Sequence, residues 1–519
     1  MPAGGSSDEK SVRSASRKVA RGGVINILGN LVGLVDPLFM MAVSWLLGAG
    51  TLGSYVLATT YVAMLLRLGV MGLDKGLLRH LPMARASDSP EENQARVLGT
   101  ALRWIAGLSL VGTAAVYLLS GVIAARGGGD AAGDAAWWLS IMVFAVPGEA
   151  ITFFYLFALR GANRMGPFVL VRQLIRPLLL FAVAMPAIAL GAGKTSLVIA
   201  YLAAQYGSVL VGHVLYMKAF PRFGFLRILR ASQDRSLLSF AFPQGLTEFL
   251  NYLLARADIL MISFFFPGKP ELLAVYAVAS MLAGVVKKVR QAFDTSMAPV
   301  ISDQIARGET DLLRTTYQRA SRWIFAPFLG LSGILVFGAP LLLAAFGPEY
   351  PAYWLVVPIL IGGRFLNAAG GPAQMALLMA GKSRLELLNN VLTNAGNIAF
   401  NLYMIPRFGI YGAAIATATS VTLFNMARIA QVLVLLRIGP KLRDVARIVL
   451  TGALAAAPAV LVLTLPGGLL RHAVALPIFV VCYLVIVYLV GMRSDLKTLY
   501  RYLARRRRKP TSVSGQETR

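Results

Sequence analysis

Long runs of apolar residues alternate along this chain with short polar connections. A helix needs about twenty apolar residues to cross about 30 Å of hydrocarbon at 1.5 Å per residue. Fourteen runs approach this length, and they predict fourteen membrane-spanning helices at residues 23–47, 53–73, 97–124, 135–159, 167–190, 196–217, 237–265, 272–298, 323–346, 353–379, 386–405, 411–436, 448–465 and 473–492.

The basic residues are distributed unevenly between these runs. The N-terminal segment, the even-numbered connections and the C-terminal tail hold 35 of the 50 Lys and Arg residues, whereas the odd-numbered connections hold five. Cytoplasmic connections of membrane proteins carry an excess of Lys and Arg. An even number of spans brings both ends to one side, so the bias predicts that both termini lie in the cytoplasm.

The composition agrees with an all-α integral membrane protein. Of the 519 residues, 57% are hydrophobic and only 14% are charged, which is more apolar surface than a water-soluble core would hide. The net charge of +27 is therefore interpreted as a topology signal, and no nucleic-acid partner is expected. The single cysteine, Cys482, and three scattered histidines favour neither disulfides nor a metal site, and no cofactor is expected.

The chain also contains a weak internal repeat: an echo of the first half appears in the second half at an offset of about 221 positions. Tyr55 then falls on Tyr276, Arg67 falls on Lys288, and Asp36 falls one residue from Asp258. Many transporters consist of two related halves with a site between them. The echo predicts two pseudo-symmetric six-helix lobes around a central cavity.

The domain boundaries follow from the spans and the echo. The predicted parts are a basic cytoplasmic segment at 1–22, an N-lobe at 23–220, a cytoplasmic inter-lobe linker at 221–236, a C-lobe at 237–436, two extra helices within 445–492, and a basic cytoplasmic tail at 493–519.

One stretch of the second half carries a recognisable motif. Gly381-Lys382 is followed by Asn397 and Asn401, then by the segment IPRFGIYGAA at 405–414. This pattern, together with a first hairpin that contains Leu47-Gly48 and Gly53-Ser54-Tyr55, resembles the polysaccharide transporter group of the multidrug/oligosaccharidyl-lipid/polysaccharide exporter superfamily.

The resemblance implies a Wzx-like flippase. Such a carrier moves a polyprenyl-diphosphate-linked oligosaccharide, a repeat unit of O-antigen, capsule or exopolysaccharide, across the inner membrane by alternating access. The implied partners are this lipid-linked oligosaccharide, membrane lipids, and polysaccharide polymerase or export proteins.

Ten basic residues fall inside the predicted spans, where each costs at least about 2.5–3.5 kcal/mol. Only five acids, among them Glu149, accompany them, so local pairing leaves a positive excess. We expect an anionic cargo to complete the balance, because Arg and Lys bind phosphate oxygens. The predicted cationic cavity contains Arg67, Arg172, Arg176, Arg256, Lys287, Lys288, Arg290 and Arg364.

Helical spacing refines this set. Lys287 and Arg290 are three residues apart and share a face, whereas Lys288 is rotated away by about 100°. Arg172 and Arg176 are four apart and also share a face. The alternative is structural: Arg290 pairs with Asp294 at i,i+4, or a side chain near a span end, such as Arg103, Arg172 or Arg428, extends to the interface.

Four acids within the spans are candidates for coupling to a proton or sodium ion, because a carboxylate in a low dielectric is readily neutralised. They are Asp36, Glu248, Asp258 and Asp294. Permanent salt bridges are the alternative for these acids. A stripe of Asn390, Asn394, Asn397 and Asn401 on one helical face serves either helix contacts, which we favour, or sugar hydroxyls.

Other functions are less consistent with the sequence. A lipid II flippase is the nearest alternative, since it also combines fourteen spans with a cationic cavity. A drug or cation antiporter of the same superfamily calls for an acidic cavity. A membrane glycosyltransferase or ligase is expected to carry a sizeable outer loop, and the longest outer connection, 125–134, has only ten residues. The chain is therefore predicted not to be an enzyme.

Overall fold

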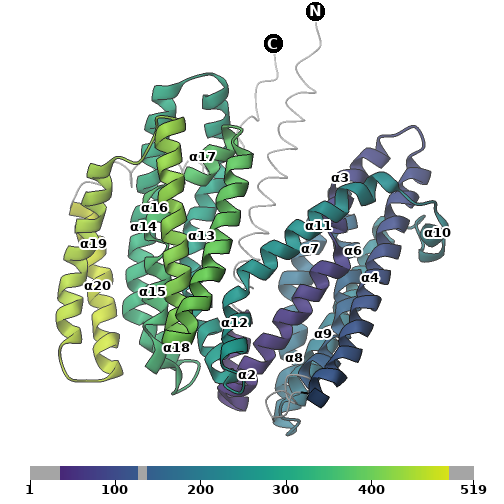
Figure 1. Ribbon diagram of the computed structural model, residues 1–519, viewed down its shortest axis with the longest axis horizontal. Coiled ribbons are helices and arrows are strands. Elements are labelled where there is room, and N and C mark those ends of the chain that lie inside the picture. The colour runs from purple at the N-terminus through teal and green to yellow at the C-terminus, as the bar shows by residue number, and fades with distance from the viewer. Residues whose placement is uncertain (1–34, 127–136, 490–519) are drawn as a thin grey trace, which may run out of the picture. The chain divides into compact units, whose positions relative to one another are not determined.

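The computed structural model describes residues 35–126 and 137–489, and these segments contain helices and no strand (Figure 1). Helices satisfy every backbone donor and acceptor internally, as hydrocarbon requires. Several predicted features lie outside the described residues: the segment 1–22, the start of the first span, most of the outer connection 125–134, and the tail 493–519.

The described residues form two compact units. The first comprises residues up to Val278 with 345–348 and Asn401–Ala413, and the second comprises Ala279–Ala344, Glu349–Phe400 and the residues from Ala414 onward. The two six-helix lobes stay a prediction.

The first unit is built from helices that pack side by side. α2 packs against α4 and α6, α6 packs against α9, and α9 packs against α8 (Figure 1). The helices are α2 (Val35–Val70), α3 (Leu73–Arg85), α4 (Pro90–Arg126), α6 (Ala145–Gly161), α7 (Gly166–Val169), a π-helical turn (Leu170–Ile175), α8 (Arg176–Ala189), α9 (Thr195–Ala219), α10 (Phe225–Arg230), α11 (Arg235–Ala255) and α12 (Ala257–Phe265).

The division assigns parts of α13 and α18 to each unit, and within the second unit α14 packs against α19 and α20. The helices are α13 (Pro270–Ala306), α14 (Thr310–Ala344), a 3₁₀ turn (Tyr350–Tyr353), α15 (Val356–Gly362), α16 (Phe365–Ala369), α17 (Ala373–Met379), α18 (Ser383–Leu435), α19 (Leu442–Leu463) and α20 (Leu469–Leu489).

Eleven segments of the described residues are long and apolar enough to cross a membrane. Two of them contain a break: α2 leaves the helical region at Gly48, and α18 does so at Gly409, with φ values of 83° and 58° that favour glycine. Both breaks fall where the hydrophobic pattern separates two spans. α11 and α12 follow one another along the chain, and together they cover the predicted span 237–265. Counted in this way, the helices agree with fourteen spans.

Residues of the segment predicted as a linker, 221–236, form hydrogen bonds with α4 of the first unit. Arg103 donates to the carbonyl oxygens of Leu229 and Ala231 at 2.8 and 2.7 Å, and the Asp234 amide donates to the Thr100 hydroxyl at 2.8 Å. The carbonyls at the end of α10 have no partner within that short helix, so the guanidinium supplies one. Arg103 therefore has structural partners in the backbone of residues 229–231.

A close backbone crossing joins α11 to the junction of α2 and α3. A Cβ atom added to Gly245 would lie 2.2 Å from the carbonyl carbon of Met71, and one added to Gly72 would lie 2.2 Å from the Ala241 oxygen. Met71 and Gly72 both have positive φ, at 40° and 75°. Small residues allow helices in membranes to approach this closely.

Candidate functional site

The second unit contains a cavity of about 260 Å³. Its fifteen lining residues come from α13, α14, α16, α17 and α18 and from the turn before α16. Four are basic, seven are uncharged polar residues and none is acidic: Val286, Lys287, Arg290, Gln291, Phe328, Arg364, Asn367, Ala368, Gln374, Asn390, Thr393, Asn394, Val421, Asn425 and Arg428. A cavity with this lining suits a ligand that carries negative charge and hydroxyl groups.

The helical spacing of the basic residues on α13 decides which of them line the cavity. Lys287 and Arg290 both line the cavity, as their three-residue separation predicts. Lys287 and Lys288 are both exposed, but Lys288 is not among the lining residues. Arg364, just before α16, contributes the third of the predicted cations. The structure thus brings together Lys287, Arg290 and Arg364 within one unit.

Arg428, which the sequence places near a span end, is instead one of the most enclosed charges of the second unit. It is 6% exposed and pairs with Glu386, itself 2% exposed, at 3.0 and 3.1 Å. Its remaining donors reach the side-chain oxygens of Asn390 and Asn425 at 2.8 and 3.4 Å. Sequence reasoning missed Glu386, because this residue stands at the first position of a predicted span.

A second ion pair connects to the first through an amide. Arg290 lies 3.4 Å from Asp294, which confirms the pair expected at i,i+4. Arg290 also donates to Gln374 at 3.2 Å, and Gln374 donates to Glu386 at 2.9 Å. The wall of the cavity therefore includes a continuous network that joins Arg290 and Arg428 to the carboxylates of Asp294 and Glu386.

The asparagine stripe of α18 divides between two uses. Asn390 and Asn394 line the cavity. Asn397 donates to Thr417 at 2.9 Å, and Asn401 donates to Asp258 at 2.8 Å, so these two join helices within their units. Asn390 also accepts a hydrogen bond from Arg428 at 2.8 Å, so three of the four side chains make the helix contacts that we favour.

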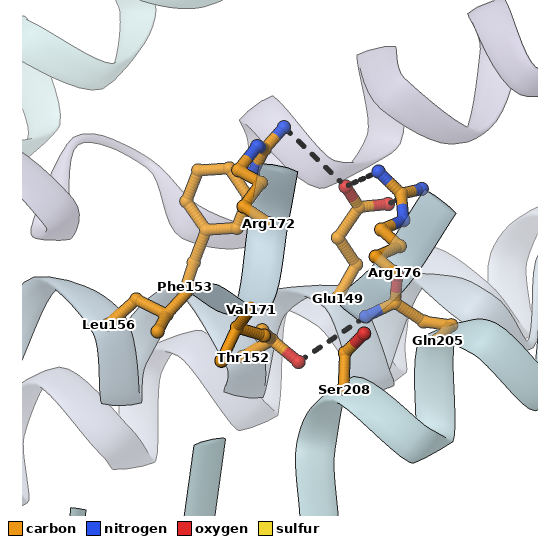
Figure 2. A pocket seen from close by; sticks show the side chains of 9 residues that line it. All are labelled: Glu149, Thr152, Phe153, Leu156, Val171, Arg172, Arg176, Gln205 and Ser208. Carbon is orange, nitrogen blue, oxygen red and sulfur yellow. Dashed lines mark hydrogen bonds and ion pairs between the residues drawn. The ribbon is translucent and has the colours of Figure 1, made fainter. Parts of the chain in front are cut away.

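The first unit holds a separate polar cluster, shown in Figure 2. Arg172 and Arg176 both face the buried Glu149, with nitrogen to oxygen distances of 3.8 and 3.4 Å, and this confirms that the two arginines share a face. The π-helical turn carries Arg172 and ends immediately before Arg176. Arg172 also lies over the Phe153 ring at 4.4 Å, and Arg176 donates to the Tyr201 hydroxyl at 3.2 Å.

This cluster is packed closely. Its pocket has a volume of only about 10 Å³, which suffices for about one water molecule. Its side chains are largely committed to one another, and in this state it has no room for a phosphate group. The cavity of the second unit is accordingly the stronger candidate for cargo.

The last two predicted cations, Arg67 and Arg256, contact one aromatic side chain. Their guanidinium carbons lie 5.6 and 5.9 Å from the centre of the Tyr252 ring. Arg67 also lines a pocket of about 10 Å³ with Asp74 and Glu248. These contacts stay within the first unit, and Arg256 is exposed there.

The four predicted coupling acids occupy different surroundings. Asp258 accepts hydrogen bonds from Tyr276 at 2.6 Å and from Asn401 at 2.8 Å, and Asp294 pairs with Arg290. Asp36 is exposed, within electrostatic range of Arg176. Glu248 is half-buried. Within the described part of the chain, no three His, Cys, Asp or Glu residues are grouped as a metal site would require.

Comparison with known proteins gives the family. The family described as polysaccharide biosynthesis protein matches residues 19–304, more than half of the chain. A curated relative, the probable low-salt glycan biosynthesis flippase Agl15 of Haloferax volcanii, is 24% identical over 189 residues. That match covers 36% of this chain and 39% of the relative, so it spans about two fifths of the relative's length.

Solved structures share the fold. The lipid II flippase MurJ in an inward closed conformation has a TM-score of 0.70 at 13% identity, and the likeness covers 91% of this chain and 100% of that one. An inward-facing multidrug resistance MATE family transporter of the MOP superfamily has a TM-score of 0.65 at 15% identity, with 79% and 94% covered. The relatives are flippases and transporters, not enzymes, as the sequence predicts for this chain. The all-α fold of a multi-pass membrane protein is thereby confirmed.

Proposed function

This chain belongs to the polysaccharide biosynthesis protein family, and we propose that it is a flippase for a polyprenyl-diphosphate-linked oligosaccharide. The proposal places it in a bacterial inner membrane with both termini in the cytoplasm. Its cargo is a repeat unit of a surface polysaccharide, and polymerase and export proteins act on that unit afterwards.

The observation that carries the proposal is the lining of the cavity in the second unit. Four basic residues and seven uncharged polar residues line it without an acid. A diphosphate brings oxygens that accept from guanidinium and ammonium groups, and an oligosaccharide brings hydroxyls that exchange hydrogen bonds with amides. A cationic drug would meet repulsion from the same wall.

The mechanism proposed is alternating access between the lobes 23–220 and 237–436. The diphosphate and sugars enter the polar cavity from the cytoplasmic side, while the prenyl chain stays in lipid. The lobes then rock and expose the headgroup on the other side. Arg67, Arg172, Arg176 and Arg256 are proposed to meet the diphosphate along this path, and Asp36, Glu248, Asp258 and Asp294 are the acids proposed for ion coupling.

The test is neutralisation of the cavity cations in cells that depend on this chain. Lys287→Ala and Arg364→Gln should each reduce export of the polysaccharide about tenfold or more, because each removes a charge-assisted contact worth about 1.5–3 kcal/mol. Lipid-linked oligosaccharide extracted from the membranes should accumulate, and its amount by mass spectrometry is the measurement.

Lys288→Ala is the matched control. Lys288 is the neighbour of Lys287 on α13 but does not line the cavity. Its substitution should leave export close to that of the natural chain at equal expression. Full export by both Lys287→Ala and Arg364→Gln would refute the assignment. Accumulation of lipid II instead of the oligosaccharide would favour the peptidoglycan alternative.

A further inference from the structure

The helix α19 of the second unit has one face that packs within the protein and one face that is exposed. Its packed face lies against α14 and α20 (Figure 1). Ile448, Thr451, Gly452 and Ala455 are buried on this face, and Gly452 lies directly against Leu329 of α14. The opposite face is left to whatever surrounds the protein.

The exposed face of α19 begins with two arginines and continues with apolar side chains. Residues that are three or four positions apart share a face of a helix. Six exposed residues follow this spacing, and they form one stripe along α19: Arg443, Arg447, Leu450, Leu454, Ala457 and Leu461. The stripe is therefore cationic at the beginning of the helix and apolar beyond it.

The charges at the beginning of α19 are divided between the two faces. Asp444 belongs to the packed face, where it pairs with Arg322 at 3.6 Å and its side chain is 14% exposed. Arg443 and Arg447 form no ion pair with any residue that the structure describes. At the other end of the helix pair, by contrast, Arg471 donates to the Leu463 carbonyl oxygen at 3.0 Å. The two arginines of the stripe are thus left for an anion from outside the chain.

The dimensions of the stripe match one leaflet of a bilayer. α19 is long and apolar enough to cross a membrane, and the distribution of Lys and Arg predicts that it begins at the cytoplasmic side. From Arg447 to Ala457 the helix rises by about 15 Å, which is about half the thickness of the hydrocarbon. An acyl chain of the cytoplasmic leaflet therefore reaches along Leu450 and Leu454 when its phosphate lies at the arginines.

The net charge of the headgroup decides which phospholipid suits this stripe. Guanidinium groups donate in pairs to phosphate oxygens. A zwitterionic headgroup also brings a cationic group, which the arginines repel. An anionic headgroup such as phosphatidylglycerol brings only the phosphate charge and hydroxyls, and basic residues at the cytoplasmic surface attract lipids of this kind.

We propose that the exposed face of α19 binds an anionic phospholipid of the cytoplasmic leaflet. Its phosphate lies on Arg443 and Arg447, and one of its acyl chains lies on Leu450 and Leu454. This lipid is a component of the surrounding membrane and not the cargo. The inference goes beyond the proposed function and does not depend on it.

The experiment detects the lipid that lies next to α19. Purified full-length protein with Ala453→Cys in a Cys482→Ser background carries a bimane label beside Leu454, at a position that is exposed. The protein is placed in nanodiscs with equal amounts of phosphatidylglycerol and phosphatidylcholine, and one of the two lipids has brominated acyl chains. Bromine quenches the label of a lipid-facing site, so the two brominated mixtures give the relative binding constant of the two lipids at this face.

The relative binding constant should favour phosphatidylglycerol about fivefold or more, because each basic residue near a lipid phosphate contributes about fivefold. Arg443→Gln with Arg447→Gln should bring the constant close to one. Lys382→Gln with Arg384→Gln is the matched control, since it removes two exposed cations from the turn before α18 and should leave the preference unchanged.

A second label tests whether the preference is local. Val481→Cys lies on an exposed part of α20, within residues 473–489, which include no basic residue. Brominated phosphatidylglycerol and brominated phosphatidylcholine should quench this label equally. An equal preference for phosphatidylglycerol at both labels would refute a site on α19.

Three further outcomes would overturn the proposal. The first is equal quenching by the two brominated lipids at Ala453→Cys in the natural arginine background. The second is an undiminished preference in the double variant of Arg443 and Arg447. The third is loss of the preference when excess geranylgeranyl diphosphate is added, which would assign the face to a prenyl diphosphate. None of these outcomes contradicts the flippase proposal.

Discussion

At the scale of single residues, the buried ion pair of Arg428 and Glu386 holds polar side chains of the cavity wall in place through hydrogen bonds. Each of the three guanidinium nitrogens of Arg428 has an acceptor, and Glu386 receives bonds from both Arg428 and Gln374. A buried ion pair offsets its desolvation cost only when such additional hydrogen bonds satisfy it. The pair therefore depends on its amide neighbours as much as they depend on it.

Removal of one member of this pair should be costly. Glu386→Ala leaves the Arg428 charge enclosed without a carboxylate, and such changes cost about 3–5 kcal/mol. The midpoint of thermal unfolding of the purified protein, followed by tryptophan fluorescence, should fall clearly. Replacement of both partners, as Glu386→Ala with Arg428→Met, should restore much of the loss.

The control for this prediction is the pair of Arg307 and Asp303. It has a similar distance, 3.0 Å, but its side chains are 64% and 57% exposed. Asp303→Ala should cost only about 0.5 kcal/mol or less, as exposed i,i+4 pairs usually do. Equal losses from Glu386→Ala and Asp303→Ala would contradict the central role given to the buried pair.

At the scale of elements, the hydrophobic pattern predicts the helices well and their irregularities poorly. The boundaries near Gly48 and Gly409 could be predicted, since each glycine stands between two apolar runs. The π-helical turn at Leu170–Ile175 could not, because Arg172 and Gln173 stand among apolar residues there as they would in a regular membrane helix. The same holds for the break between α11 and α12 at Arg256, whose sequence continues the apolar pattern on both sides.

The crossing of α11 with the junction of α2 and α3 gives a prediction at this scale. Gly245→Ala would place its methyl group 2.2 Å from the carbonyl carbon of Met71, so the helices must separate. Overpacking of this kind costs about 1–3 kcal/mol. The thermal midpoint of the purified protein should drop accordingly.

Gly284→Ala on α13 is a suitable control for that change. A methyl group there has no heavy atom within 4 Å, and alanine is the better helix former. This variant should be at least as stable as the natural chain. If Gly245→Ala were tolerated equally well, the close crossing would not exist in the folded protein.

At the scale of the whole molecule, span number and fold class were accessible from sequence, whereas the partners of the charges were not. Apolar length and the distribution of Lys and Arg are properties of the chain as written. The carboxylate beside Arg428 lies 42 positions away, and no pattern in a single sequence connects the two. Of Arg67, Arg172, Arg256 and Lys287, which the sequence analysis places in one cavity, Lys287 lines the cavity of the second unit, and a cavity shared by all four stays a prediction.

The orientation in the membrane yields a prediction for the complete protein. In a Cys482→Ser background, Leu190→Cys should react with a membrane-impermeant maleimide in intact spheroplasts, since this connection is predicted to lie outside. Asp88→Cys should react only after the membrane is permeabilised. Both positions are exposed, so access to the thiol does not depend on packing. The reverse labelling pattern would contradict the placement of both termini in the cytoplasm.

The hydrogen bonds between α4 and the segment 221–236 have a consequence for a chain that is split into two fragments at this segment. A gene split after Pro221 would encode one fragment with Arg103 and Thr100 and another with Leu229, Ala231 and Asp234. Each fragment would then carry one side of this joint, which is the set of hydrogen bonds between α4 and residues 229–234. Coexpressed pieces would meet through this joint, and the connecting peptide bond would be dispensable for their assembly.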